Sequence, residues 1–277
     1  MFGFTILPAL LQIALSAWLA ESPRWLLAQN KPKDAADILR RLRGMNDVYE
    51  EIDSICSASD RESANVSVWH VICDQSIRYA LVVSIGLQVA QQFSGINAVI
   101  FYANSFFQDI GVANPLIGTT LVGAINVVST GVALALMDRV GRRPLLLWSC
   151  AGMLVSAVIL TAALLHWLPS ASTLSVGALM CYVWFFEIGL GPIPWLIVAE
   201  MFPSQPRPTA MSLATMVNWI CSFIIGIVFP TLQASMHNFS FVPFGCVLLA
   251  SDVFTLRYVP ETKGKTLEEI QKELSER

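Results

Sequence analysis

Long runs of apolar residues dominate this sequence and restrict what it can fold into. A helix that crosses a membrane needs about 20 mostly apolar residues, and residues 2–20, 79–107, 115–137, 145–167, 174–199, 209–232 and 239–258 meet that need. The chain is 55% hydrophobic and 13% charged, with a mean hydropathy of +0.61, whereas a soluble domain is about one-quarter charged. The sequence therefore predicts an all-α membrane protein with these stretches as its spans.

The lysines and arginines are unevenly distributed among the segments that connect the spans. They lie in the polar segment 21–78, between the third and fourth spans, between the fifth and sixth, and at the end of the chain. Because basic connections face the cytoplasm, this pattern places the C-terminus in the cytoplasm and the N-terminus outside. An outside N-terminus without a signal sequence, joined to an odd number of spans, leads us to expect further helices upstream.

The polar segment 21–78 predicts a cytoplasmic linker made of helices. KDAADILRRLRG, which starts at Lys33, has apolar residues at helical spacing and Gly44 as its stop. NDVYEEIDSIC, which starts at Asn46, predicts a second, acidic helix. A solvated connector and a latch both agree with this composition. After the last span, Thr266 and Glu269 form a capping-box pattern that opens a short helix.

Polar side chains lie near the middle of several predicted spans. For any one of them, an interhelical hydrogen bond worth about 0.6 kcal/mol is a sufficient explanation. Taken together, and at similar depth, they favour a shared cavity, because intramembrane polar groups usually face a bundle interior and often mark a substrate path. The residues are Gln88, Gln91, Gln92, Asn97, Asn126, Glu187 and Asn218.

The chemical type of these groups restricts the ligand. No Lys or Arg lies near the middle of any predicted span, so an anionic substrate would have no counter-charge there. Amides both donate and accept hydrogen bonds, and a tryptophan covers an apolar surface while its N–H makes one directed bond. A small neutral molecule rich in hydroxyls, most simply a sugar, agrees best with this lining.

Other classes of function lack their sequence signatures. The six cysteines are scattered without a CxxC pair, so neither a disulfide framework nor a zinc site is indicated. The chain has no HExxH or GxSxG motif, and no basic cluster interleaved with aromatic residues. We therefore expect no enzymatic activity, no cofactor, no metal and no nucleic-acid partner.

The second span is expected to break near its centre. At 100° per residue, Gln88, Gln91 and Gln92 share one helix face, but Asn97 joins them only if the helix unwinds near Ser94-Gly95. Broken helices at midplane binding sites recur in transporters.

The fifth span carries a second expected break, in GLGPIPW from Gly189 to Trp195. Pro192 and Pro194 each remove a backbone donor and clash with the preceding turn. The carbonyls that lose their donors must then be satisfied by neighbouring side chains or by water in a cavity.

Seven motifs occur in order along nearly the whole chain: ESPRWL (21–26), QQFSGINA (91–98), DRVGRR (138–143), FFEIGLGPIPW (185–195), AEMFPSQPRP (199–208), NW (218–219) and PETKGKTLEEI (260–270). Together they resemble the sugar porter family of the major facilitator superfamily, especially its facilitative hexose transporters. The resemblance implies transmembrane helix 6 (1–20), a cytoplasmic helical linker domain (21–78), the C-terminal six-helix half with helices 7–12 (79–259), and a cytoplasmic tail (260–277). Family members have twelve helices, so an N-terminal helix bundle is expected in the complete protein.

The resemblance also implies roles for individual residues. The family's sugar contacts correspond to Gln91, Gln92, Asn97, Asn126, Glu187, Trp195 and Asn218, with Phe186 and Trp219 as apolar walls. A cytoplasmic charge network that ties the two halves together corresponds to Glu21, Arg24, Arg139, Arg142, Arg143, Glu200, Arg207 and Glu261. The implied function is transport of a glucose-like sugar by alternating access across a lipid bilayer, in the plasma membrane.

A few positions depart from the family pattern. Gln88-Val89-Ala90 replaces the QLS tripeptide of some glucose-preferring members, which leaves the choice of hexose open. Ala20 replaces a proline before ESPR, and Leu190 stands where a proline is common. A non-transporting sugar sensor and an inert or regulatory fragment are the alternative functions. Sensors carry long C-terminal extensions, whereas this sequence ends shortly after Pro260.

Overall fold

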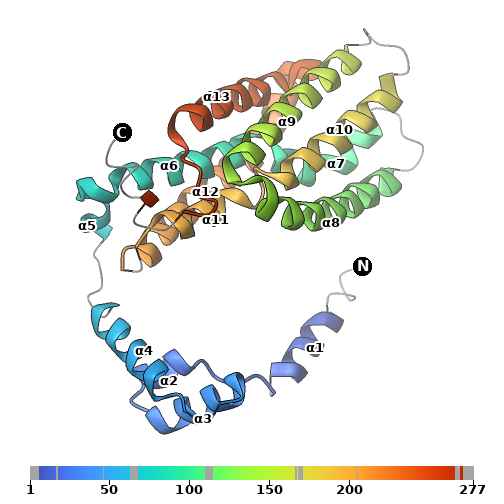
Figure 1. Ribbon diagram of the computed structural model, residues 1–277. Coiled ribbons are helices and arrows are strands. Elements are labelled where there is room, and N and C mark those ends of the chain that lie inside the picture. Colours follow the sequence, from blue (N-terminus) through green and yellow to red (C-terminus); the bar gives the residue numbers. More distant parts are fainter. Residues whose placement is uncertain are drawn as a thin grey trace. The chain divides into compact units, whose positions relative to one another are not determined.

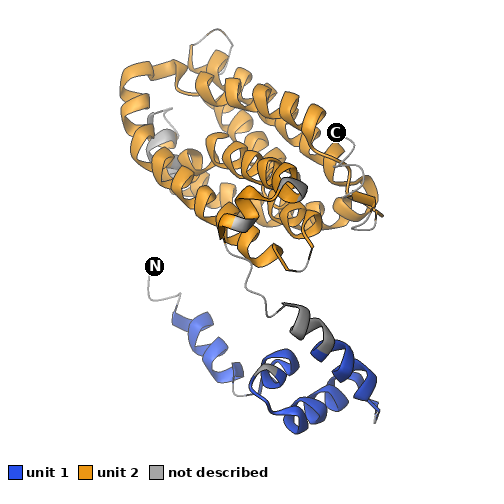
Figure 2. Ribbon diagram, turned by 90° about the vertical axis from the view of Figure 1, so that its left-hand side faces the viewer, with its two compact units in different colours: residues 1–65 blue, residues 66–277 orange. Residues whose placement is uncertain are grey.

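The computed structural model describes residues 6–16, 18–45, 47–62, 68–109, 115–165, 167, 171–203, 205–265 and 269–270. Across these residues the regular structure is helical and contains no strand (Figure 1). The chain divides into two compact units, residues 1–65 and residues 66–277 (Figure 2). The predicted all-α fold is thereby confirmed.

The first unit holds an apolar helix and the helices of the linker: α1 (Ile6–Ser16), α2 (Pro23–Ala28), α3 (Pro32–Arg43) and α4 (Tyr49–Glu62). α3 and α4 are the two linker helices that the sequence predicts, and α3 stops at Gly44 in the left-handed conformation, with φ of 68°. Leu39 and Ile52 belong to the small core between them. A hydrogen bond from the Arg43 guanidinium, 2.7 Å long, lowers the pKa of the Glu51 carboxyl.

The second unit contains the remaining helices: α5 (Val68–Cys73), α6 (Gln75–Phe93), α7 (Ile96–Asp109), α8 (Pro115–Val140), α9 (Arg142–Leu164), α10 (Ala171–Ile188), α11 (Ile193–Met201), α12 (Arg207–Met236), the 3-10 turn η2 (His237–Phe239) and α13 (Val242–Tyr258). α9 lies between α10 and α13, α6 packs against α12, and α8 packs against α10 (Figure 1). α5 contacts α6 and α12. It therefore belongs to this unit, although the sequence places it in the linker domain.

Four helices of the described part are long and apolar enough to cross a membrane: Leu116–Val140, Arg142–Leu164, Ser172–Met201 and Arg207–Phe239. The other expected spans correspond to α1, to α6 with α7, and to the 17-residue α13. The count of seven spans stays a prediction. The capping box at Thr266 lies outside the described residues.

Both expected breaks are confirmed. α6 ends at Phe93 and α7 begins at Ile96, with Gly95 between them in the left-handed conformation at φ of 86°. A Cβ at Gly95 would lie 2.6 Å from the ring of Phe244, so both its conformation and its surroundings require glycine. In the fifth span α10 ends at Ile188 and α11 begins at Ile193, so the helix is interrupted over the four residues that contain Leu190 and Pro192.

A strained residue at the end of α12 gives a test of the fold. His237 has φ of 46° and ψ of −116°, a conformation that side chains other than glycine adopt at a cost of about 1–3 kcal/mol. We expect His237→Gly to increase the free energy of unfolding by about 1 kcal/mol. The increase is measured as a higher thermal unfolding midpoint of the protein in detergent.

Asn238→Gly is the matched control, because Asn238 is not among the described residues with positive φ. Glycine at position 238 only increases the conformational entropy of the unfolded chain, so we expect an unchanged or lower unfolding midpoint. Equal stabilisation by both variants would contradict the assignment of strain to His237.

Candidate binding site between the broken helices

A cavity of about 480 Å³ opens beside the two helix breaks. Eight of the nine residues that the sequence assigns to the sugar site line it: Gln91, Gln92, Asn97, Phe186, Glu187, Trp195, Asn218 and Trp219. The ninth, Asn126, contacts Glu187. Ile96, Ile100, Phe101, Gly191, Pro192 and Ser222 complete the lining. The structure thus brings the predicted residues together from α6, α7, α10, α11 and α12.

Asn218 of α12 is the centre of the amide cluster and is only 1% exposed. Its Nδ2 donates to Gln88 Oε1 at 2.6 Å and to Gln91 Oε1 at 2.7 Å. Its Oδ1 accepts a hydrogen bond from Gln92 Nε2 at 2.8 Å. Both N–H groups of the asparagine amide are therefore in use. Asn218 consequently fixes α12 against three glutamines on one face of α6.

Asn97 joins this cluster because the chain breaks before it. α7 begins at Ile96, and Asn97 Nδ2 donates to Gln92 Oε1 and to Ser222 Oγ, the latter at 2.9 Å. An unbroken helix would place Asn97 and Gln92 more than 100° apart around its axis. The turn at Ser94-Gly95 is therefore what places an amide of α7 beside the glutamines of α6.

Gln91 closes the second break from across the cavity. Pro194 has no N–H, so Leu190 O, four residues earlier, loses its helical donor. Gln91 Nε2 donates to Leu190 O at 3.0 Å and to Gly191 O at 2.6 Å. This is the satisfaction by a neighbouring side chain that the two prolines lead us to expect. It also leaves the amide oxygen of Gln91 to accept the hydrogen bond from Asn218.

Glu187 is the one carboxylate in the lining, and α8 holds it. Asn126 Nδ2 lies 2.5 Å from Glu187 Oε1, and Thr130 Oγ1 lies 3.2 Å from Oε2. Both donors to Glu187 are neutral. Among the described residues, no Lys or Arg lines the cavity, so these residues place no fixed positive charge there.

The predicted charge network is only partly made of ion pairs in the described residues. Arg142 pairs with Glu200 at 2.9 Å. Glu261 instead accepts the backbone N–H groups of Arg142 and Arg143, at 3.0 and 3.1 Å, and so caps the start of α9. Arg207 donates to the carbonyl of Phe202 at 2.8 Å.

Among the described residues, no ion pair is found for the other members of that network. Arg143 Nη2 donates to the carbonyl of Leu256 at 2.6 Å, and Arg139 is exposed. Glu21 and Arg24 are exposed on the first unit. Their role as a latch stays a prediction.

Sequence reasoning missed several residues that hold the site. Gln88 was recognised as polar but not assigned to the site, although it binds Asn218. Thr130, Ser222 and Tyr182 were not singled out at all. Thr130 and Ser222 lie four residues after Asn126 and Asn218, on the same helix faces, and this spacing is the signal that identifies them. Tyr182 carries no such signal.

The central position of Asn218 gives a direct stability test. Asn218→Leu preserves the size of the side chain but leaves buried atoms of three glutamines without a partner, at about 1–3 kcal/mol for each unsatisfied group. We expect the free energy of unfolding to fall by about 2 kcal/mol or more, measured as a lower thermal unfolding midpoint in detergent.

The control is Ser235→Ala, which removes an exposed hydroxyl that donates to the carbonyl of Leu232 in its own helix. This substitution should change the free energy of unfolding by no more than about 0.5 kcal/mol. An Asn218→Leu variant as stable as the wild type would show that the amide cluster does not stabilise the fold.

Known proteins resemble this chain over almost its entire length. The family model described as "Sugar (and other) transporter" matches residues 1–274. Solute carrier family 2, facilitated glucose transporter member 3 of Canis lupus familiaris is 41% identical over 278 residues, which cover 98% of this chain and 56% of the relative. The Homo sapiens protein of the same name is 41% identical over 275 residues, covering 98% and 55%.

Solved structures show the same relationship. The proton:xylose symporter XylE bound to 6-bromo-6-deoxy-D-glucose matches with a TM-score of 0.78 and 30% identity, over 99% of this chain and 58% of the other. XylE from E. coli in an inward open conformation matches with a TM-score of 0.76 and 30% identity, over 96% and 54%.

The chain spans about half the length of the curated relatives that it matches. The family model nevertheless matches nearly all of its residues, and the motifs that the model covers build the cavity described above. This chain belongs to the sugar (and other) transporter family, and its relatives place it among the sugar porters of the major facilitator superfamily.

Proposed function

We propose that the complete protein carries a neutral hexose across a membrane by alternating access, and that the amide-lined cavity holds the sugar. The observation that carries this proposal is the composition of the cavity wall: side-chain amides, one carboxylate, two tryptophans and no Lys or Arg. Pockets of about 300–1,000 Å³ are usual for small-molecule ligands, and this one has about 480 Å³.

The hydrogen bonds among the amides explain how a sugar enters such a site. Asn97 donates hydrogen bonds to Gln92 and to Ser222. A sugar hydroxyl both donates and accepts, so it replaces these bonds without leaving a buried group unpaired. Trp195 and Trp219 supply the flat apolar surfaces that cover the ring face of a sugar.

Exposed aromatic side chains at the rim of the cavity support the inference that a further part of the complete protein covers it. Trp219 is 64% exposed and Phe101 is 60% exposed, and both line the open cavity. The curated relatives are nearly twice as long as this chain. We infer that the N-terminal helix bundle of the complete protein covers this rim, and that the two bundles rock about the sugar between them.

The basic segments support the orientation. Arg139, Arg142 and Arg207 lie in connections on the side where the linker is attached, and the opposite connections carry no Lys or Arg. By the positive-inside rule the linker and the C-terminus are cytoplasmic. The named glucose transporters, to which this chain is 41% identical, support a glucose-like substrate. We propose the plasma membrane as the location of the complete protein.

Asn97→Ala tests the site within the complete protein. The variant removes an amide that lines the cavity and binds both Gln92 and Ser222. We expect the dissociation constant for D-glucose to rise about tenfold or more, equivalent to about 1.4 kcal/mol, in a ligand-protection thermal-shift titration. Asn238→Ala, an exposed asparagine outside the cavity, should bind like the wild type. Wild-type affinity in Asn97→Ala would overturn the assignment of the site.

Transport itself is tested with the purified complete protein in liposomes. We expect saturable uptake of D-glucose and none of L-glucose, because the fixed positions of the amides discriminate between mirror images. Uptake that does not saturate, or that is equal for the two enantiomers, would contradict the proposed function.

A further inference from the structure

Each helix break is closed by a side chain from outside its own helix. At the first break, the Tyr182 hydroxyl donates to the carbonyl of Ser94, and Ser94 Oγ donates to the carbonyl of Gln91 at 2.6 Å. At the second break, Gln91 Nε2 donates to the carbonyls of Leu190 and Gly191. The Leu190 N–H donates in turn to Ser149 Oγ of α9 at 3.0 Å.

These contacts are reciprocal. Tyr182 belongs to α10, the helix that leads into the second break, and it closes the first break. Gln91 belongs to α6, the helix that leads into the first break, and it closes the second. Each break therefore depends on the position of the helix that contains the other. We name Gln91, Ser94, Ser149, Tyr182 and Leu190 the cross-brace.

Most of the cross-brace is sealed from solvent, and only Gln91, which is 4% exposed, also lines the cavity. Tyr182, Ser94 and Ser149 are completely buried, and Leu190 is 1% exposed. A carbonyl or N–H that loses its partner in such a place finds no water to replace it, at a cost of about 1–3 kcal/mol. A change at one break that shifts Tyr182 or Gln91 consequently strains the other break as well.

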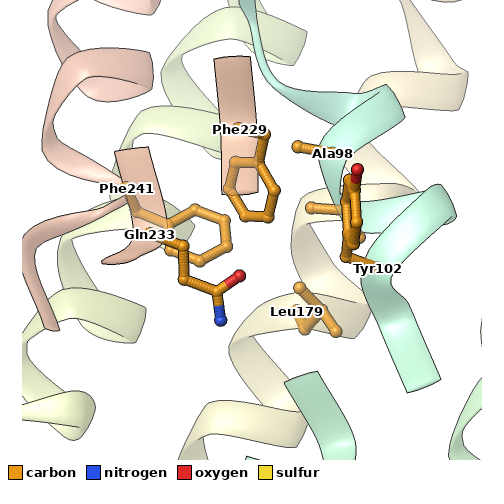
Figure 3. Close-up of a pocket in the computed structure, with 7 residues that line it drawn as sticks. Ala98, Tyr102, Leu179, Phe229, Gln233 and Phe241 are labelled. Carbon is orange, nitrogen blue, oxygen red and sulfur yellow. The ribbon is translucent and has the colours of Figure 1, made fainter. Parts of the chain in front are cut away.

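The packing beside this cross-brace leaves a small gap next to α7. A cavity of about 10 Å³ lies beside the first two turns of α7, lined by Ala98, Val99, Tyr102, Leu179, Phe229, Gln233 and Phe241. Figure 3 shows the rings of Phe229, Phe241 and Tyr102 around this space, with Leu179 below them. The ring of Tyr182 meets Phe241 edge-on, with centroids 6.3 Å apart. Tyr182 therefore contacts both the break and the wall of the cavity.

We propose that Tyr182 is a positioning residue that couples the two breaks, so that opening one loosens the other. The proposal rests on the proposed transport function, since a coupled pair of bends is useful only to a protein whose helices bend during its cycle. Tyr182 does not line the sugar cavity, and so it acts on the movement of α7 and α11 rather than on contacts with the sugar. The sequence motifs give Tyr182 no role.

Amide hydrogen exchange of the complete protein tests the coupling without relying on transport. Tyr182→Phe preserves the ring and removes one hydrogen bond, to Ser94 O. We expect exchange to become about threefold faster or more in residues 91–98, where that bond was lost, and equally in residues 188–196, which Tyr182 does not brace directly. Faster exchange confined to residues 91–98, or no change in either segment, would overturn the proposal.

Ser149→Ala provides the converse experiment, because it removes only the acceptor for the Leu190 N–H. We expect it to speed exchange in residues 91–98 as well as in 188–196. Tyr79→Phe is the matched control. It also removes one hydrogen bond from a tyrosine hydroxyl to a backbone carbonyl, in this case the 2.9 Å bond from Tyr79 of α6 to Tyr258. Neither of these two residues belongs to a break. This variant should leave both segments unchanged. If Tyr79→Phe produces the same pattern, the effect is general loosening and the proposal fails.

Transport measurements then distinguish a positioning role of Tyr182 from a role in stability alone. We expect Tyr182→Phe to lower the turnover of D-glucose about threefold or more, with its dissociation constant within about twofold of the wild type, and Tyr79→Phe to change neither. A wild-type protein that carries no sugar would refute the proposed function and leave the exchange experiment to decide on the coupling. A Tyr182→Phe variant with wild-type turnover, in a protein that does transport, would refute the coupling alone.

Discussion

Inside a membrane, a break in a helix leaves carbonyl groups without their helical donors, and side chains of the protein or water in a cavity must replace those donors. Two of the predicted spans break, at Ser94-Gly95 and between Ile188 and Ile193. The side chains that satisfy the breaks are polar, and they gather because the breaks lie close to each other. Gln91 takes part in both a break and the amide cluster: its nitrogen donates to a carbonyl of the second break, and its oxygen accepts a hydrogen bond from Asn218. The binding cavity is thus a consequence of how the breaks are satisfied.

The amide cluster has a further property that suits a transporter. Its members satisfy one another, so under the proposed function a ligand would gain only by exchanging hydrogen bonds. Net gains of about 0.5–1.5 kcal/mol for each hydrogen bond would give moderate affinity, which would let a sugar leave as readily as it enters. Glu187, held by Asn126 and Thr130 of α8, adds a stronger acceptor at one side of the cavity. A fixed positive charge would favour anions, and the lining has none.

Local chemistry made some features of this structure predictable. Gly95 and the two prolines identify both breaks, since glycine permits a left-handed residue and proline removes a donor. The polar residues at mid-span identify the cavity, because such groups have few other reasons to be there. Gly44 and the apolar spacing identify α3. In each of these cases the residue type itself dictates the result.

Features that depend on contacts between distant segments were not predictable in this way. Tyr182 reads as one more aromatic residue in an apolar run, and only the packing of α10 on the first break gives its hydroxyl an acceptor. Glu261 was expected in a charge network, but it caps the backbone of α9, because backbone N–H groups at a helix start compete with arginine side chains for a carboxylate. The segment of α5 lies within the predicted linker, residues 21–78, whereas its contacts are with α6 and α12.

The central claim is that the amides around the two breaks hold the sugar. The most direct measurement is a structure of the complete protein with D-glucose bound. The account predicts sugar hydroxyls within hydrogen-bond distance of Gln92, Asn97 and Asn218, with a ring face against Trp195 or Trp219. A sugar bound elsewhere, with the amide cluster still closed on itself, would contradict it.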